Sequence, residues 1–221
     1  MFVNVNGIEL YYEKVGQGES VILLHGNGED HTIFDVLTER LSAEHTVYAI
    51  DSRDHGKSGR VKELDYGTMA EDVAAFIREL DIRNAVVYGF SDGGIIGLLL
   101  AIKYPMALSK LIISGANTQP DGIKKRFIIQ MQIIYFFTRS RKYRLMLTQP
   151  NITEAELNTI TAPTLVLAGS GDIVRGDHTE SIAKSIPGSV LRILDGEGHA
   201  SYVVHSEKLY GVIAPFLRGA G

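Results

Sequence analysis

Short apolar runs alternate with amphipathic segments along most of the chain. Near the start, polar and apolar residues alternate over residues 2–5 and 8–15, on either side of Asn6-Gly7. This dipeptide favours the positive φ angles of a tight turn, so the pattern predicts an antiparallel β-hairpin. Further strands are predicted from short continuous apolar runs, as expected for strands buried on both faces of a sheet. Such runs cover residues 21–24, 47–50, 85–88 and 111–113, and two more strands are predicted at residues 164–167 and 190–194.

Apolar residues at helical spacing separate these runs. In residues 69–80, for example, Met69, Val73 and Phe76 recur on one face of a helix. Other helices are predicted at residues 34–41, 93–104, 179–185 and 201–216. Strands that alternate with helices predict an α/β fold, with a mostly parallel sheet, helices on both of its faces and the hairpin at its start. The length fits one domain over residues 1–221.

Residues 118–160 interrupt the alternation. They contain an apolar and aromatic segment, residues 123–137, with many basic residues around it. These basic residues are Lys124, Lys125, Arg126, Arg139, Arg141, Lys142 and Arg144. A long insertion without a strand is usually functional, and we expect a short helical lid over a site. An apolar segment flanked by Lys and Arg also fits a helix that lies on a membrane surface, although a packed lid helix is the simpler interpretation.

Reactive residues follow most of the predicted strands. Ligands of parallel sheets bind beyond the carboxyl ends of the strands, so side chains at these positions are candidates for a functional site. They are His25, Asp51, Ser91, Asn117, Asp172 and His199.

Ser91 stands in a sharp strand-to-helix turn. The segment Gly89-Phe90-Ser91-Asp92-Gly93 matches the pattern G-x-S-x-G and lies between a predicted strand and a predicted helix. Such a turn strains the serine backbone and exposes its Oγ, while the glycines allow close packing. The N-terminus of the following helix directs N–H groups toward developing negative charge. The pattern therefore predicts a nucleophile at Ser91 rather than a serine that only caps a helix.

A serine hydroxyl needs a neighbouring base to act as a nucleophile at neutral pH. His199 directly follows the last predicted strand, and it comes after Ser91 in the chain, as the order nucleophile, acid, histidine requires. His25 belongs to a turn after an earlier strand, His55 to a polar turn, and His205 to the predicted last helix. His199 is therefore the predicted base.

The imidazole in turn needs a carboxylate that fixes its tautomer and stabilises the imidazolium. Asp172 follows the strand at residues 164–167 and lies between Ser91 and His199 in the chain. Asp177 and Asp195 remain alternatives, although aspartate at such positions commonly caps a helix or a turn.

The segment His25-Gly26-Asn27-Gly28 follows the strand at residues 21–24. Glycines let the backbone approach a substrate closely, so this turn is a candidate oxyanion loop. We expect the backbone amides of Asn27 and Asp92 to supply the two donors of an oxyanion hole. We expect a substrate pocket lined by His25, Gly26, Phe127, Met131 and Tyr135.

Five motifs in this order resemble the α/β-hydrolase superfamily over nearly the whole chain. They are the oxyanion loop at residues 25–28, the D-x-R-G-x-G-x-S turn at 51–59, the nucleophile turn at 89–94, the acid loop at 169–174 and the histidine loop at 198–199. Asp54 replaces the usual glycine of the second motif, and the insertion is shorter than the family's usual helical cap. A serine nucleophile disfavours the aspartate-dependent haloalkane dehalogenases and epoxide hydrolases. Asp92 followed by two glycines is similar to small biphenyl-hydrolase-like esterases.

Composition narrows the chemistry further. The chain has no cysteine, which excludes a disulfide framework and a thiolate nucleophile. The net charge is -4, so no global basic signal favours nucleic acid. The first ten residues lack the pattern of a signal peptide, and no apolar run is long enough for a membrane span. We therefore expect a soluble, cytoplasmic protein without a metal or a cofactor; the pattern leaves its oligomeric state open.

The resemblance implies a serine hydrolase that cleaves a small carboxylic ester, a thioester or a lactone through an acyl-enzyme. Alternatives on the same three residues are a C–C bond hydrolase and a cofactor-free haloperoxidase. A non-catalytic protein that binds a ligand on this fold is a further alternative, because fold alone does not define function.

Overall fold

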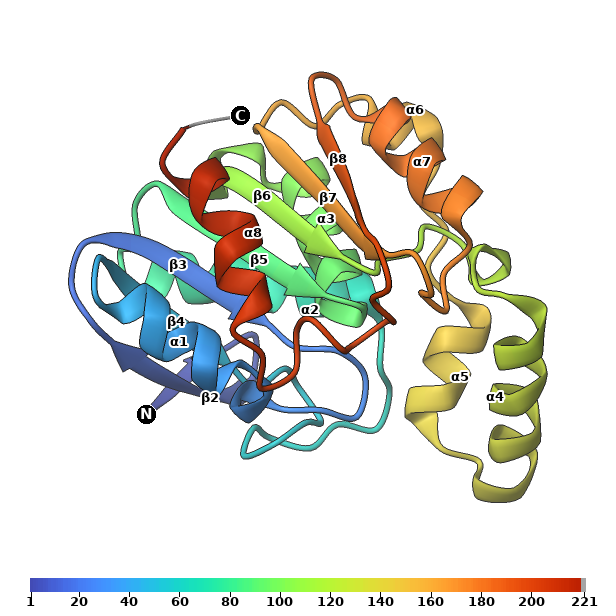
Figure 1. Cartoon of the computed structure of the whole chain (residues 1–221). Helices are drawn as coiled ribbons and strands as arrows, with labels where there is room; N and C mark the ends of the chain where they lie inside the picture. Colours follow the sequence, from blue (N-terminus) through green and yellow to red (C-terminus); the bar gives the residue numbers. More distant parts are fainter. Residues whose placement is uncertain (220–221) are drawn as a thin grey trace.

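The computed structural model describes residues 1–219 and contains one eight-stranded sheet in the order β1-β2-β4-β3-β5-β6-β7-β8 (Figure 1). The strands are β1 (Phe2–Val5), β2 (Ile8–Val15), β3 (Glu19–Leu24), β4 (His45–Ile50), β5 (Ala85–Phe90), β6 (Leu108–Ser114), β7 (Thr164–Gly169) and β8 (Val190–Leu194). β2 pairs antiparallel with β1 and with β4, and every other neighbouring pair is parallel. The predicted mostly parallel sheet is confirmed.

The predicted hairpin forms the first edge of this sheet. Val5 pairs with Ile8 across the turn. Asn6 and Gly7 have φ angles of 47° and 75°. Both angles lie in the left-handed region, which asparagine and glycine adopt more readily than other residues, so the local sequence defines this turn.

Helices cover both faces of the sheet. On one face, α1 (Asp35–Ser42) and α8 (Lys208–Leu217) pack against the strands, together with the short helix η1 (His31–Phe34). On the other face lie α2 (Tyr66–Glu79), α3 (Asp92–Lys103) and α7 (Gly176–Ser185). A 3₁₀ turn, η2 (Pro105–Ala107), follows α3. Every helix within residues 1–219 is too short or too polar to span a bilayer.

Between β6 and β7 the chain leaves the sheet. This insertion contains η3 (Pro120–Gly122), α4 (Lys125–Thr138), α5 (Arg141–Thr148) and α6 (Glu154–Leu157). α4 and α5 lie side by side, outside the helices that cover the two faces of the sheet (Figure 1). Leu145 of α5 and Leu157 of α6 join the core beneath α2 and α3, so the insertion is anchored to the fold.

The end of the chain differs from the prediction. The last helix starts at Lys208 instead of residue 201, and residues 201–205 form turns. His205 therefore lies outside the helix, with a φ of 48°, and its N–H donates to the carbonyl of Ile33. The hydroxyl of Ser206 accepts from the Lys208 N–H. These long-range and capping bonds hold the turn, and helical periodicity in the sequence does not reveal them.

A buried ion pair ties the loop after β4 to α2, and a hydrogen bond to the same carboxylate adds the N-terminal hairpin. Arg53 donates two hydrogen bonds, of 2.5 and 2.6 Å, to the carboxylate of Asp72 on α2, and Asn6 donates a third, of 3.0 Å. Asp72→Asn leaves the Arg53 charge without its partner, so the free energy of unfolding should fall by about 3–5 kcal/mol in urea titrations.

Two controls test this expectation. Arg53→Met combined with Asp72→Leu removes both charges and should restore most of the lost stability. Arg78→Gln opens an exposed pair with Glu79 and should cost less than about 1 kcal/mol. A loss in Asp72→Asn no larger than in Arg78→Gln would contradict the assignment.

Candidate active site

Ser91 lies at the carboxyl end of β5, in the centre of the sheet, and α3 starts immediately after it. Its backbone has φ 53° and ψ -116°, a conformation that residues other than glycine rarely adopt. A Cβ on Gly93 would lie 2.0 Å from the carbonyl oxygen of Leu24, and one on Gly89 would lie 2.1 Å from the carbonyl oxygen of Gly93. The two glycines therefore permit the close packing that holds Ser91 in this turn.

Three side chains from separate strand ends form one hydrogen-bonded chain. Nε2 of His199 lies 3.1 Å from Oγ of Ser91. Nδ1 of His199 lies 2.7 Å from Oδ1 of Asp172. Gly115, after β6, makes room for the imidazole, because a Cβ there would lie 2.7 Å from Cε1 of His199. A hydroxyl, an imidazole and a carboxylate in this order can pass a proton from the hydroxyl to the imidazole.

Asp172 is the carboxylate that contacts His199. Burial of Asp172 acts to raise its pKa, but the hydrogen bond and charge of His199 and the N–H of Val174 together hold this pKa below the ordinary value. Asp177 is exposed and pairs with Arg175, and Asp195 is exposed beside Ser170. The geometry thus brings neither of the two alternative acids to the imidazole.

The loop after β3 faces the Ser91 turn. Nδ2 of Asn27 donates to Oδ2 of Asp92 at 2.8 Å and to the carbonyl of Lys142 at 3.3 Å. Within residues 1–219, neither the Asn27 nor the Asp92 backbone N–H donates to a protein acceptor. Asp92 is the first residue of α3, where backbone N–H groups have no partner within the helix. Both N–H groups are therefore available to an anionic oxygen.

The Asp92 carboxyl is buried behind this turn. Burial raises the pKa of Asp92 to about 6, although its neighbours Tyr66 and Asn27 favour the charged form. Between about pH 4 and 6 the folded protein therefore holds a proton that the unfolded chain has released. Because the native state binds more protons in this window, the free energy of unfolding contributed by Asp92 falls as the pH rises through it.

Asp92→Asn removes this titration while keeping an acceptor for Asn27. Relative to wild type, the variant should gain stability between pH 4 and pH 7, by up to about 3 kcal/mol for a shift of about two pKa units. Urea unfolding at pH 4, 5.5 and 7 measures the difference, with the exposed Asp195→Asn as the control. Parallel stability curves for Asp92→Asn and wild type would contradict the expectation.

Two cavities meet at Ser91 and His199. The inner cavity has a volume of about 20 Å³, and the outer one about 270 Å³. The inner cavity is lined by Tyr66, Ser91, Asp92, Gly115, Asn117, Ile123, Met131, Met146, Gln149, Ile173, Val174 and His199. The outer cavity is lined by Asn27, Gly28, Glu29, Phe90, Ser91, Ser140, Lys142, Tyr143, Met146, Ile173, His199 and Ala200.

Of the five residues expected in the substrate pocket, Met131 lines a cavity beside Ser91. The other four are absent from both linings. His25 is fully buried, with Nδ1 bonded to the Gly26 carbonyl and Nε2 accepting from the Ser52 N–H, so it holds two loops together. Phe127 and Tyr135 instead pack under the guanidinium groups of Arg126 and Arg139. Helical spacing alone does not tell which face of α4 turns inward.

Several cavity residues carry no local sequence signal. Tyr66 begins α2, and Met146 lies on α5. Glu29 accepts a hydrogen bond from the Gly26 N–H, and burial raises the pKa of Glu29. Burial lowers the pKa of Lys142, which in the sequence is one of several basic residues of the insertion. These side chains reach the site through tertiary packing, so spacing along the chain does not reveal them.

The structure explains Asp54, the residue that replaces a glycine in the second motif. Its φ is 64°, in the left-handed region where glycine is favoured and aspartate is tolerated. Its carboxylate is buried and receives Nη2 of Arg141 at 3.2 Å on both oxygens. Asp54 therefore fastens the start of α5 to the body of the protein.

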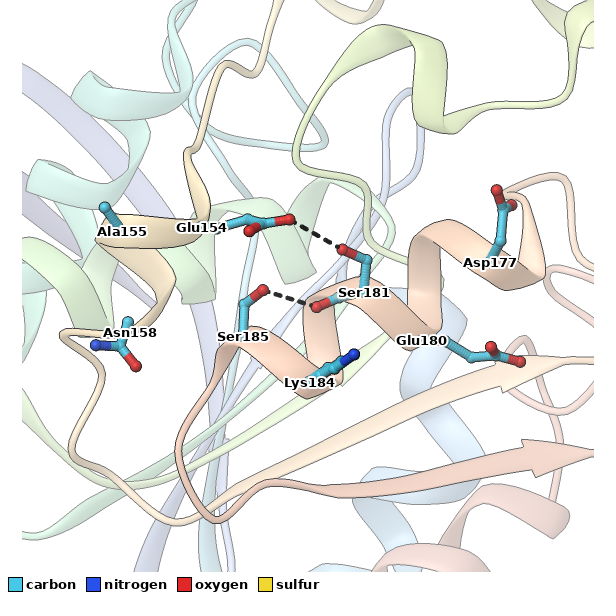
Figure 2. Close-up of a pocket in the computed structure, with 8 residues that line it drawn as sticks. All are labelled: Glu154, Ala155, Asn158, Asp177, Glu180, Ser181, Lys184 and Ser185. Carbon is cyan, nitrogen blue, oxygen red and sulfur yellow. Dashed lines mark hydrogen bonds between the residues drawn. The ribbon is translucent and has the colours of Figure 1, made fainter.

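A cluster of acidic and histidine side chains and a surface groove lie outside the Ser91 site. Asp30, His31 and Asp51 offer ligand atoms within 4.8 Å of one another. The Asp51 carboxylate already accepts the N–H of His31 and of Lys57, and its Oδ1 lies 2.6 Å from the His31 ring, so these contacts serve to hold loops. A groove of about 700 Å³ between α6 and α7 is lined mainly by exposed polar side chains (Figure 2).

The family model described as alpha/beta hydrolase fold matches residues 19–152. This is more than half of the chain, and the chain belongs to this family. The strand order, the turn at Ser91 and the positions of Asp172 and His199 after later strands agree with that assignment.

Among curated proteins, the chain is similar to the AB hydrolase superfamily protein YisY of Bacillus subtilis, with 28% identity over 95% of each chain. It is also 28% identical to the human serine hydrolase BPHL, over 98% of this chain and 85% of the relative. An esterase from Exiguobacterium antarcticum has a TM-score of 0.86 at 24% identity, with 98% of each chain covered. A thermophilic esterase from Thermogutta terrifontis has a TM-score of 0.83 at 24% identity, over 99% and 97%. The two curated relatives support a hydrolase of the α/β family, and the two solved structures show the same fold.

Proposed function

We propose that the protein is a serine hydrolase that cleaves small carboxylic esters through an acyl-enzyme. The observation that carries this proposal is the pair of hydrogen-bond contacts of His199. Its Nε2 lies 3.1 Å from Ser91 Oγ, and its Nδ1 lies 2.7 Å from Asp172 Oδ1. The similarity to a serine hydrolase of the same family supports it.

In the proposed mechanism, Oγ of Ser91 attacks the ester carbonyl carbon while Nε2 of His199 takes the hydroxyl proton. The tetrahedral intermediate collapses, the C–O bond to the alcohol breaks, and His199 gives the proton to the leaving alcohol. Water then attacks the acyl-enzyme, with His199 as the base, and releases the acid and free Ser91. Asp172 keeps Nδ1 protonated and stabilises the imidazolium throughout.

The developing oxyanion requires donors that are already in place. We propose the backbone N–H groups of Asn27 and Asp92, which have no acceptor within residues 1–219. The side chain of Asn27, bonded to the Asp92 carboxylate, holds the two donors at a fixed separation. Preorganised donors of this kind contribute about 3–4 kcal/mol each to transition-state stabilisation.

The two cavities favour a short acyl chain. A p-nitrophenyl leaving group fits the outer cavity of about 270 Å³, which leaves the inner cavity of about 20 Å³ for the acyl group. That space holds little more than one water molecule or a methyl group. We therefore expect p-nitrophenyl acetate to be a better substrate than the butyrate or octanoate.

Met131→Ala should enlarge the inner cavity. The ratio of kcat/KM for butyrate to that for acetate is expected to rise by about tenfold, the effect of one or two methylenes in a closed pocket. The matched control is Gln132→Ala, an exposed neighbour on α4. An unchanged ratio in Met131→Ala would place the acyl group elsewhere.

A substrate panel separates the remaining candidates. We expect turnover of aryl and alkyl acetates, with thioesters and lactones as further possible substrates of the same chemistry. Preferred cleavage of β-diketones would indicate a C–C bond hydrolase, and halogenation with peroxide would indicate a haloperoxidase. Absence of turnover on the whole panel would favour a ligand-binding protein.

A further inference from the structure

The outer face of α4 carries a stripe of exposed apolar side chains. Ile129, Ile133, Phe136 and Phe137 are 47, 54, 63 and 77% exposed. At 3.6 residues per turn they fall within an arc of about 100° along two turns of the helix. Met131, on the opposite side of α4, faces the inner cavity. No other element within residues 1–219 buries this stripe, which we call the α4 stripe.

Basic side chains accompany the α4 stripe at both ends. Lys125 and Arg126 are exposed on the same helical face, one turn before Ile129. At the other end, the Arg139 guanidinium lies 5.5 Å from the ring centre of Phe136. In the part of the chain that the structure describes, no carboxylate pairs with these three cations. The stripe therefore combines apolar area with unneutralised positive charge.

This charge is local to residues 118–150, the part of the insertion that contains α4 and α5; the following α6 carries two acids, Glu154 and Glu156. Residues 118–150 contain seven Lys and Arg and one acid, Asp121, whereas the whole chain has a net charge of -4. The rest of the chain is therefore strongly acidic. An anionic surface would attract residues 118–150 and repel the remainder of the protein, which orients α4 toward that surface.

We propose that the α4 stripe docks on a lipid bilayer with anionic headgroups. Phe136, Phe137 and the two isoleucines enter the boundary between headgroups and acyl chains, while Lys125, Arg126 and Arg139 contact lipid phosphates. A second copy of the chain fits less well. A two-fold contact through α4 brings the same basic residues of both copies together, and the segment offers only Asp121 to neutralise them.

Vesicle co-sedimentation of the full chain tests the proposal independently of any catalytic activity. The probes are vesicles of phosphatidylcholine with phosphatidylglycerol, and vesicles of phosphatidylcholine alone. Wild type should bind the anionic vesicles at least about tenfold more tightly, and added salt should weaken this binding. Equal or absent binding to the two vesicle types would overturn the proposal.

Two variants locate the contact. Phe136→Ser combined with Phe137→Ser should reduce the partition coefficient by more than about tenfold, because two exposed phenyl groups no longer enter the lipid. Lys125→Gln combined with Arg126→Gln should reduce it by about tenfold on anionic vesicles. Met106→Ser is the matched control, since Met106 is 96% exposed on η2, outside the insertion, and should bind as wild type does.

Circular dichroism and urea midpoints unchanged from wild type establish that each variant is folded. Folded phenylalanine variants that bind anionic vesicles like wild type would overturn the proposal. Sedimentation velocity gives a second readout. A wild-type dimer that the phenylalanine substitutions dissociate, without vesicle binding, would instead assign the α4 stripe to a contact between copies of the chain.

Discussion

Ser91→Ala is expected to lower kcat for p-nitrophenyl acetate by on the order of 10⁴- to 10⁶-fold, the largest loss of any single substitution. Without Oγ no acyl-enzyme forms, and His199 and the N–H groups of Asn27 and Asp92 retain only weak activation of water. KM should change little, because alanine fits the same turn and leaves both cavities in place. Steady-state kinetics measure the loss, and the absence of an initial burst of nitrophenol supports it.

A fluorophosphonate probe gives an independent test of the same substitution. Wild type should be labelled with one probe per chain, and Ser91→Ala should not be labelled. The matched control is Ser185→Ala on α7, whose hydroxyl donates to the Ser181 carbonyl and which lines neither cavity at Ser91. Labelling of Ser91→Ala at the wild-type rate would move the nucleophile to another residue and defeat the proposed mechanism.

Asp172→Asn is expected to lower kcat by on the order of 10⁴-fold with little change in KM. The amide keeps the shape of the carboxyl group but can donate to Nδ1 of His199. It therefore favours the tautomer whose Nε2 carries the proton, and that nitrogen cannot accept the proton of Ser91. The loss of negative charge also removes the stabilisation of the imidazolium.

Asp177→Asn and Asp195→Asn are the controls for this prediction. Both residues are exposed acids near the same edge of the sheet, and neither contacts His199. Their turnover should stay within about twofold of wild type, as is usual for exposed sites. Near-normal turnover of Asp172→Asn together with a large loss in either control would reassign the acid.

Local sequence was sufficient to predict most of the sheet. Asn6-Gly7 defines a hairpin through the φ angles that these two residues tolerate. Residues 190–194 were predicted as a strand with the bounds that β8 has in the structure. β8 is a partly buried edge strand and contains Arg192, whereas the central strand β3 contains the continuous apolar run Val21–Leu24 because both of its faces are buried. The predicted start of the last helix was wrong, because the turn at His205 depends on a hydrogen bond to the distant Ile33.

For the site, too, local sequence determined some features and tertiary packing determined others. The sequence by itself determined the family resemblance, the strained turn at Ser91 and the order in which acid and histidine follow it, because these depend on local turn geometry and on alternating strands. Only the tertiary structure decided that Asp172 rather than Asp177 or Asp195 meets His199. It also decided that Met131 faces inward from α4 while Ile133 faces solvent. Which side chains face the site depends on how helices and loops are oriented when they pack, and the spacing of residues along the chain does not predict that orientation.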